Sequence, residues 1–339
     1  MNEYFKEYYC PSCNEKTDTK KLKFEYKTNR YIKYLNNRFN LNDKLIIENT
    51  ELSQCLNCDL IFFNKWLKEY YIKILYSETR HHSGWSRFFM ILSNNQKFLN
   101  NRLMILKFMH NRFNNIYSYA EFGCPFMGFL LIFSLIKNKE KSLVYNISNI
   151  FLKKNIDDTR YYKKLSIFYN LIGYLNIIIL KTYNFFNNLK NKSLFKNFDS
   201  KNNPQKLYFI KNTTERNWNL GCNVMNVNCK NLINMENDIN FVELKDLSEK
   251  IDLVYLDNSI DHTENISNVL NKIFNNSNNI LIQAHGINDG VQHSFFLTLN
   301  YLKKISIKLN FKVTILNKDL IKIDNDPNLE EKFYLLEKN

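Results

Sequence analysis

The chain has 339 residues, of which 45% are hydrophobic and 24% are charged. This length favours two structural units, and the balance excludes both a wholly disordered chain and a membrane protein with several spans. Lys and Arg outnumber Asp and Glu by 47 to 33, which gives a net charge of +14. Because the basic residues are dispersed, we predict a solvated basic surface and no specific nucleic-acid partner. Weak attraction to nucleotides or to phospholipid headgroups at a membrane surface is the open alternative.

The first motif is a pair of C-x-x-C sequences, formed by Cys10 with Cys13 and by Cys55 with Cys58. Two such pairs bring four thiolates to about 2.3 Å from one tetrahedral zinc ion and leave no open coordination position. Disulfides are the alternative, but no secretory signal is visible at the N-terminus, and a reducing compartment disfavours them. We therefore predict a structural zinc site and a cytoplasmic location.

The segment between the two cysteine pairs is longer than in common zinc ribbons, so it must contain secondary structure of its own. Residues 22–28 and 44–50 are the candidate strands. We assign residues 1–80 to this zinc-binding domain and residues 81–115 to a helical connector.

A membrane span is the first hypothesis for the apolar segment 165–180, which lies between lysines and contains two asparagines. A spanning helix needs about 20 predominantly apolar residues. We therefore predict a buried or interface-lying helix here and no transmembrane span.

The second half of the chain alternates short apolar runs with helix-period segments. The runs that suit buried strands cover residues 116–123, 142–148, 239–244, 250–258, 278–286 and 311–316. Such alternation predicts an α/β fold with a doubly wound, mostly parallel sheet, which binds ligands at the carboxyl ends of its strands. The predicted domain covers residues 116–325, with a helical insertion at about 150–239, and residues 326–339 are a C-terminal tail.

The residues around the second cysteine pair resemble those of class I S-adenosylmethionine (SAM) methyltransferases that carry an N-terminal zinc-binding domain. These enzymes have C-P-x-C, then C-x-x-C-G-L-x-F-x-N-P and an L-Y pair. Here Cys55–Asn64 and Leu75-Tyr76 keep that frame, with Asp59 at the usual Gly and Lys65 at the usual Pro. Many members modify sugars or surface polysaccharides, so the resemblance implies SAM as cofactor and a nucleotide-linked sugar or glycan as acceptor.

The segment Glu121–Leu130 resembles the first cofactor motif of this family, [D/E]-x-G-x-G-x-G before a helix. Glycines let the backbone approach the cofactor closely and leave an open helix N-terminus. The middle glycine is replaced, since Pro125-Phe126-Met127 occupies the turn. The resemblance implies that the cofactor-binding residues are Glu121, Gly123, Cys124, Gly128, Asn146 and Asp257. A plain strand end is the alternative for Asn146, since an amide lacks the charge of the usual acid.

Two later landmarks suggest catalytic residues. Ile251–His262 resembles the family's strand that ends in a Glu-His pair, with Asp261 in place of Glu, and Gln292–Phe296 resembles its Q-H-x-x-[F/Y]-F segment. The implied catalytic residues are Asp261, His262 and His293, because either imidazole could act as a base near neutral pH. His285 follows a predicted strand and could also face the pocket.

Two functional classes stay open. The chain is either a SAM-dependent methyltransferase or a non-catalytic descendant that acts as a zinc-stapled scaffold or interaction module. The altered glycine turn favours the scaffold, whereas the Asp-His and Gln-His pairs favour the enzyme.

Overall fold

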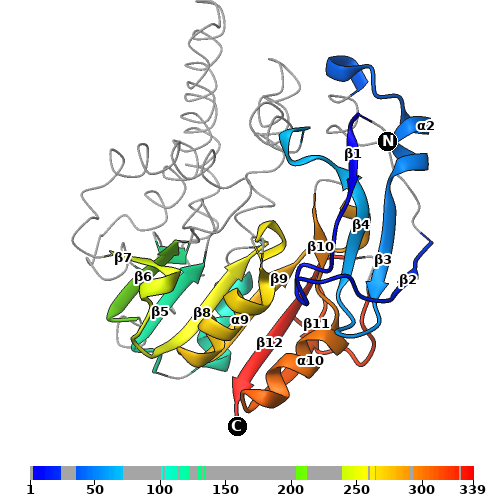
Figure 1. Ribbon diagram of the computed structural model, residues 1–339. Helices are drawn as coiled ribbons and strands as arrows, with labels where there is room; N and C mark the ends of the chain where they lie inside the picture. The colour runs from blue at the N-terminus through cyan, green and yellow to red at the C-terminus, as the bar shows by residue number, and fades with distance from the viewer. Residues whose placement is uncertain are drawn as a thin grey trace, which may run out of the picture.

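The computed structural model describes residues 3–23, 36–71, 101, 104–113, 115–122, 129–130, 133, 204–211, 239–258, 260–263, 265–289, 293–327 and 330–339. Figure 1 shows a large sheet and a small sheet, which these residues form side by side. Among the described residues, no helix is long and apolar enough to cross a membrane. The apolar segment 165–180 lies outside them.

The larger sheet has seven strands in the order β11-β12-β9-β8-β5-β6-β7. They are β5 (Ser118–Phe122), β6 (Lys206–Lys211), β7 (Ile239–Glu243), β8 (Ile251–Asp257), β9 (Ser277–Ala284), β11 (Phe311–Leu316) and β12 (Lys332–Lys338). Strands β5 to β9 pair in parallel, and β12 is antiparallel to both of its neighbours. The chain runs outward from β5 through β6 and β7 and then returns to β8 on the other side. This arrangement confirms the predicted doubly wound α/β fold and places the reversal of strand order between β5 and β8.

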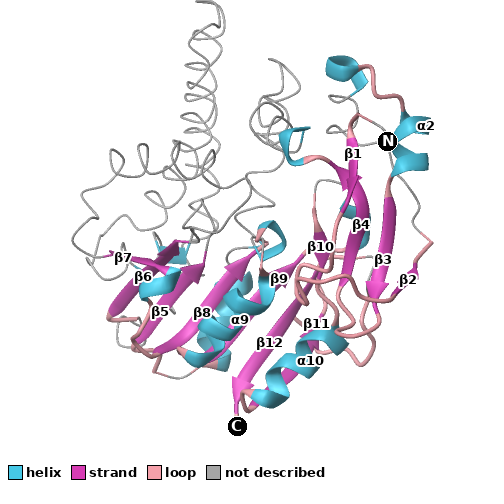
Figure 2. Ribbon diagram, in the orientation of Figure 1, coloured by secondary structure: helices cyan, strands magenta, loops and turns pink. Residues whose placement is uncertain are grey.

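Alternate residues of the central strands enter two apolar cores, one on each face of this sheet. Helices α9 (Ile266–Asn275) and α10 (Leu299–Lys308) share one core with Ala120 and Val254. Tyr119 and Tyr255 enter the opposite core, which they share with the helical residues 104–112. In Figure 2 both α9 and α10 lie on the face of the sheet that is turned to the viewer. Burial on both faces explains why the central strands have nearly continuous apolar sequences.

Two predicted boundaries of this domain are wrong. Residues 206–211 were expected within a helical insertion, yet they form β6 and pair with β5 and β7 inside the sheet. The expected tail 326–339 contains β12, which lies between β9 and β11. Both strands are short apolar runs flanked by lysines, so their sequences do not show the burial that the sheet gives them. The rest of the expected insertion up to residue 203 lies outside the described residues.

The smaller sheet contains β1 (Phe5–Glu7), β2 (Thr19–Lys21), β3 (Glu51–Cys55) and β4 (Ile61–Leu67) in the order β1-β4-β3-β2. The expected strand at 44–50 is wrong, because α2 (Asp43–Asn49) forms there. Asn42 caps this helix by accepting the Leu45 N–H at 2.8 Å, and Asp43 lies in its first turn, where an acid favours a helix. Only residues 22–23 of the other expected strand are described, and they follow β2.

A short strand from the second half of the chain is part of the smaller sheet. Strand β10 (Phe295–Phe296) pairs antiparallel with β4, opposite Phe62 and Ile61. Phe62 also belongs to the same apolar core as α9 and α10. The cysteine-bearing unit therefore shares its interior with the α/β domain.

Candidate functional site

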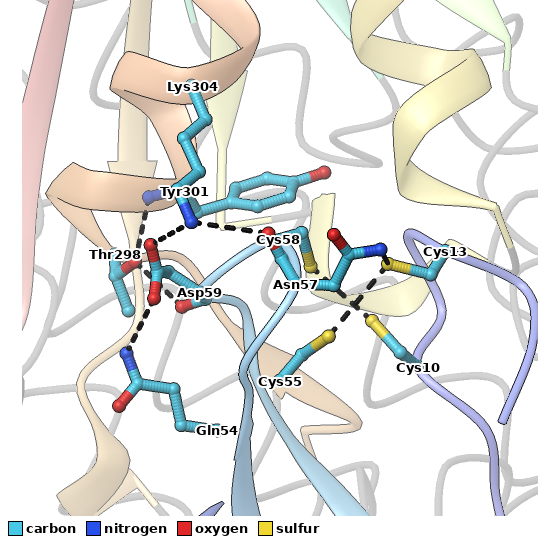
Figure 3. Close-up of polar contacts among 10 residues, drawn as sticks. All are labelled: Cys10, Cys13, Gln54, Cys55, Asn57, Cys58, Asp59, Thr298, Tyr301 and Lys304. Carbon is cyan, nitrogen blue, oxygen red and sulfur yellow. Dashed lines mark hydrogen bonds and ion pairs between the residues drawn. The ribbon is translucent and has the colours of Figure 1, made fainter. Parts of the chain in front are cut away.

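The four predicted metal ligands converge on one point. Cys55 ends β3, Cys58 follows in the turn before β4, and the other two lie in the loop after β1. The Sγ atoms of Cys10 and Cys58 are 3.5 Å apart and those of Cys13 and Cys55 are 3.8 Å apart, and all four atoms lie within 4.8 Å of one another. Figure 3 shows the sulfurs facing one another from the two knuckles. A disulfide needs about 2.05 Å, whereas tetrahedral zinc–thiolate bonds separate the sulfurs by about 3.8 Å. The geometry fits the metal and not the disulfide.

The ionisation of these thiols is strongly coupled. Burial, followed by the charge of Cys58, raises the pKa of Cys13 to about 12. The pKa of Cys55 is about 7: burial raises it, but the Thr17 hydroxyl and nearby backbone N–H groups lower it by more. Four thiolates at this spacing repel one another, so they can ionise together only around a cation.

The second knuckle is docked on α10. Lys304 Nζ lies 2.6 Å from Asp59 Oδ2 and donates to the Asn57 carbonyl at 3.2 Å. The Thr298 hydroxyl donates to the Asp59 carbonyl at 3.0 Å, as Figure 3 shows. Asp59 has φ 66°, which explains why the related motif places Gly at this position. From the first knuckle, Ser12 accepts a hydrogen bond from Tyr301, whose hydroxyl lies 3.1 Å away.

We expect Lys304→Ala to lower the free energy of unfolding by less than about 1 kcal/mol. The ammonium group is half exposed, so water and salt screen its interaction with Asp59. The shared apolar core, and not this ion pair, then holds the cysteine unit on α10. A urea titration measures the change, and a loss of several kcal/mol would contradict this explanation.

Glu121 holds the start of the helix that follows the predicted cofactor turn. It lies near the carboxyl end of β5 and is 1% exposed. Its Oε1 accepts the backbone N–H groups of Phe129 at 2.7 Å and Leu130 at 3.1 Å, and the Tyr119 hydroxyl at 3.2 Å. The carboxylate therefore fixes both ends of the connection 123–128. This connection contains the predicted cofactor residues Gly123, Cys124 and Gly128; like Asn146, they lie outside the described residues.

Glu121→Gln should lower the free energy of unfolding by about 2 kcal/mol, because a buried charged acceptor of several hydrogen bonds is replaced by a neutral one. Glu121→Ala should cost more, since it leaves two backbone donors buried beside a small cavity. Urea unfolding of both variants is compared with Glu330→Gln, which changes an exposed carboxylate. Equal stability of Glu121→Gln and the control would show that the contact contributes nothing.

A second buried carboxylate, Asp257, ends β8 beside the reversal of strand order. It is 8% exposed and accepts a hydrogen bond from the Tyr255 hydroxyl at 3.3 Å, which also donates to Gln283 of β9. Glu331, just before β12, accepts from the Asn258 amide at 3.0 Å and from the Gln283 amide. This network ties together the strand ends at the edge where open α/β sheets bind ligands. Sequence reasoning identified Asp257 alone. Tyr255 lies on the same strand, but Gln283 and Glu331, which complete the network, come from β9 and from the residue before β12.

The predicted catalytic residues Asp261 and His293 are brought together. Asp261 lies in η4 (Ile260–His262), after β8, and His293 directly precedes Ser294 and β10. Asp261 Oδ2 is in direct contact with His293 Nδ1, and both side chains are 6% exposed. The backbone of His262 lies in η4, whereas its side chain is outside the described part of the structure.

His285 completes this group. It follows β9, and its ring centroid lies 3.8 Å from that of His293, with 32° between the two planes. One ligand atom each of Asp261, His285 and His293 lies within 4.8 Å of the others. Two further 3₁₀ helices, η3 (Leu244–Asp246) and η5 (Ile287–Asp289), follow β7 and β9. The carboxyl edge of the sheet thus carries a compact cluster of two imidazoles and one carboxylate.

The fold and the two clusters define a doubly wound α/β protein with a four-cysteine unit docked on it. No family model and no curated protein matches the chain. Among the structural neighbours, the methyltransferase domain of bacterial CtHen1-C has 12% identity and a TM-score of 0.35, over 73% of this chain and 98% of that chain. The plantazolicin methyltransferase BpumL with SAH has 14% identity and a TM-score of 0.28, over 44% and 71% of the two chains. Magnesium protoporphyrin IX methyltransferase from Synechocystis PCC 6803 with SAH has 7% identity and a TM-score of 0.36, over 80% and 100%. At this level of overlap they carry no argument about activity, which therefore depends on the site.

Proposed function

We propose that this chain transfers a methyl group from SAM to a small-molecule or glycan acceptor. The observation that carries the proposal is the Glu121 carboxylate, which ties the end of β5 to Phe129 and Leu130 across the predicted cofactor turn. Strand β5, which leads into this turn, lies beside the reversal of strand order, where doubly wound folds bind nucleotide-like ligands. Asp257 ends the neighbouring strand at the same edge. A nucleotide-linked sugar or surface polysaccharide is the proposed acceptor, and it follows from the sequence resemblance alone.

The proposed reaction is a direct displacement. A lone pair of the acceptor atom forms a bond to the methyl carbon of SAM, the carbon–sulfur bond breaks, and its electron pair remains on the sulfur of S-adenosylhomocysteine. If the acceptor is a hydroxyl, its proton leaves to a group of the protein. Holding donor and acceptor in line supplies much of the rate acceleration.

We place the acceptor beside Asp261 and His293. These two buried residues come from the loops after β8 and before β10, so both approach the carboxyl edge of the sheet. The contact with Asp261 through Nδ1 orients the imidazole, which is the proposed base for the acceptor proton. His262 is the next residue along the chain and stays a prediction as a second candidate for proton transfer.

The four-cysteine cluster is proposed to hold zinc in a structural role. All four coordination positions would be thiolates, so no position is left for a substrate. Its contribution to the reaction is then to fix β4, and through the pairing with β10, the chain beside His293. A cytoplasmic location is proposed along with this site, because reduced thiolates suit a reducing compartment.

Isothermal titration of the full chain with SAM, and separately with S-adenosylhomocysteine, tests the cofactor proposal. We expect dissociation constants in the micromolar range and a loss of binding in Glu121→Ala. Glu249→Gln is the matched control, because this glutamate lies before β8 at the opposite edge of the sheet and is 58% exposed. No heat of binding up to millimolar ligand would reject the enzyme and favour the zinc-stapled scaffold.

A further inference from the structure

We propose that Asp261, His285 and His293 bind one divalent first-row transition-metal ion. Asp261 lies in the connection after β8, whereas His285 and His293 lie near the two ends of the connection between β9 and β10. One ligand atom from each residue lies within 4.8 Å of the others. Asp261 and His293 are buried and His285 is half-buried. This set is separate from the four cysteines and differs from them in chemistry.

The donor types point to a particular class of ion. Imidazole nitrogens favour zinc, iron, copper and nickel, and a single carboxylate adds one negative charge. Three protein ligands leave coordination positions open, as in catalytic metal sites, whereas the four thiolates of the other cluster close theirs. The proposed site therefore leaves room for an oxygen atom from water or from a bound molecule.

The two imidazole rings lie close to each other. Their ring centroids are 3.8 Å apart with 32° between the planes, a spacing at which two imidazolium ions would repel each other strongly. One carboxylate beside them can balance one positive charge. A shared cation would attract both neutral rings and the carboxylate at the same time.

The surrounding backbone holds the ligands in place. The Ser294 hydroxyl donates to the Asp261 carbonyl, which joins the loops that carry two of the ligands. The Ser294 carbonyl accepts from Phe63 N–H of β4 at 3.2 Å. The four-cysteine unit thus supports the segment that carries His293, and such outer contacts commonly orient metal ligands.

The role of this ion in the reaction rests on the proposed function, although the site itself does not. A cation at the acceptor position lowers the pKa of a coordinated hydroxyl, so the acceptor loses its proton near neutral pH. With the ion bound, His293 is a ligand and does not take the proton, unlike in the metal-free site proposed above. The acceptor's proton then leaves through solvent.

Zinc alone is the probe. The full chain is equilibrated with excess zinc, freed of unbound metal by gel filtration, and the bound zinc is counted by elemental analysis. We expect about two zinc ions per chain in the wild type and one fewer in His285→Gln. His285 is the decisive position because it is only half-buried, so the variant is expected to fold. His293→Ala serves as a second variant, and His110→Ala, in the helical residues 104–112, is the matched control that keeps the wild-type count.

An equal zinc count in the wild type, His285→Gln and His293→Ala, all with cooperative thermal melts, would overturn the proposal. A lower count in the two variants, with no binding of SAM by the wild type, would retain the metal site and reject methyl transfer. The zinc count therefore tests the metal site, and the SAM titration tests methyl transfer, and either proposal can be rejected without the other.

Discussion

Deleting residues 330–339 should leave a chain that no longer unfolds cooperatively. The deletion removes β12, so β11 loses the strand with which it pairs, and β9 keeps only its pairing with β8. Residues Phe333–Leu336 are all buried and enter both apolar cores. A central strand removed from a sheet exposes two new edges, which favour aggregation. Circular dichroism during heating, together with the soluble yield, measures the outcome.

Removal of β12 is also expected to destabilise α10, because Asp326 contacts both elements. Asp326 pairs with Lys332 at 2.7 Å, accepts the Tyr334 hydroxyl at 2.9 Å and accepts the Leu299 N–H at 2.6 Å. Burial, and then the charge of Asp326, raise the pKa of Tyr334. Without β12, this carboxylate keeps only its contact with the start of α10. The docking surface of the cysteine unit is therefore expected to loosen as well.

Two point variants of the full-length chain test whether the effect of the deletion comes from lost packing of β12 and not from the shorter chain. Leu336→Asp places a charge in the core and should lower the free energy of unfolding by about 4 kcal/mol or more. Lys338→Asp, two residues further on the same strand, changes an exposed side chain and should stay within about 0.5 kcal/mol. If the shortened chain or Leu336→Asp melts as the wild type does, β12 is not part of the stable core.

The strands that sequence reasoning missed are bounded by lysines, although their apolar runs are as long as those of the predicted strands. Strands β8, which reads IDLVYLD, and β9, which reads SNNILIQA, contain no lysine and were predicted as buried strands. Strand β12 reads KFYLLEK and β6 reads KLYFIK, each bounded by lysines as an edge strand or loop would be. Lys332 is buried because Asp326 neutralises its charge, and no local sequence pattern predicts such an ion pair. These two segments are buried strands because they pair with strands that are distant in the sequence.

The two candidate sites also differ in whether local sequence or long-range pairing brings their residues together. The cysteine cluster was predictable because a C-x-x-C spacing fixes two ligands locally, and two such pairs suffice. Asp261 approaches His285 and His293 only when β8 and β9 pair, so no spacing in the sequence predicts this contact. The same holds for Tyr255 and Gln283, which meet across two strands. The types of these residues indicated their possible chemistry, but only the strand topology shows that they lie close together.

The variant Cys10→Ser should release the zinc of the cysteine cluster and unfold the small sheet at a lower temperature than the rest. Cys10 is 1% exposed, and its sulfur lies 3.5 Å from that of Cys58. A serine hydroxyl is not ionised near neutral pH and binds zinc far more weakly than a thiolate. Binding of structural zinc is itself folding free energy, about 10–16 kcal/mol in small zinc peptides, so losing one ligand has a large effect. Zinc release is followed with a chromophoric chelator, and unfolding is followed by near-ultraviolet circular dichroism.

Acid should release the same ion from the wild type, because protons compete with zinc for the thiolates. The ion therefore stays bound at high pH and is lost as the pH falls. Cys222→Ser is the control, since it removes a thiol outside the two C-x-x-C pairs of the sequence, and it should bind zinc as the wild type does. A Cys10→Ser protein with full zinc content and an unchanged melting curve would show that the cluster is not a metal site. Its stability would then come from the apolar core that Cys10, Cys55 and Leu60 share with α10.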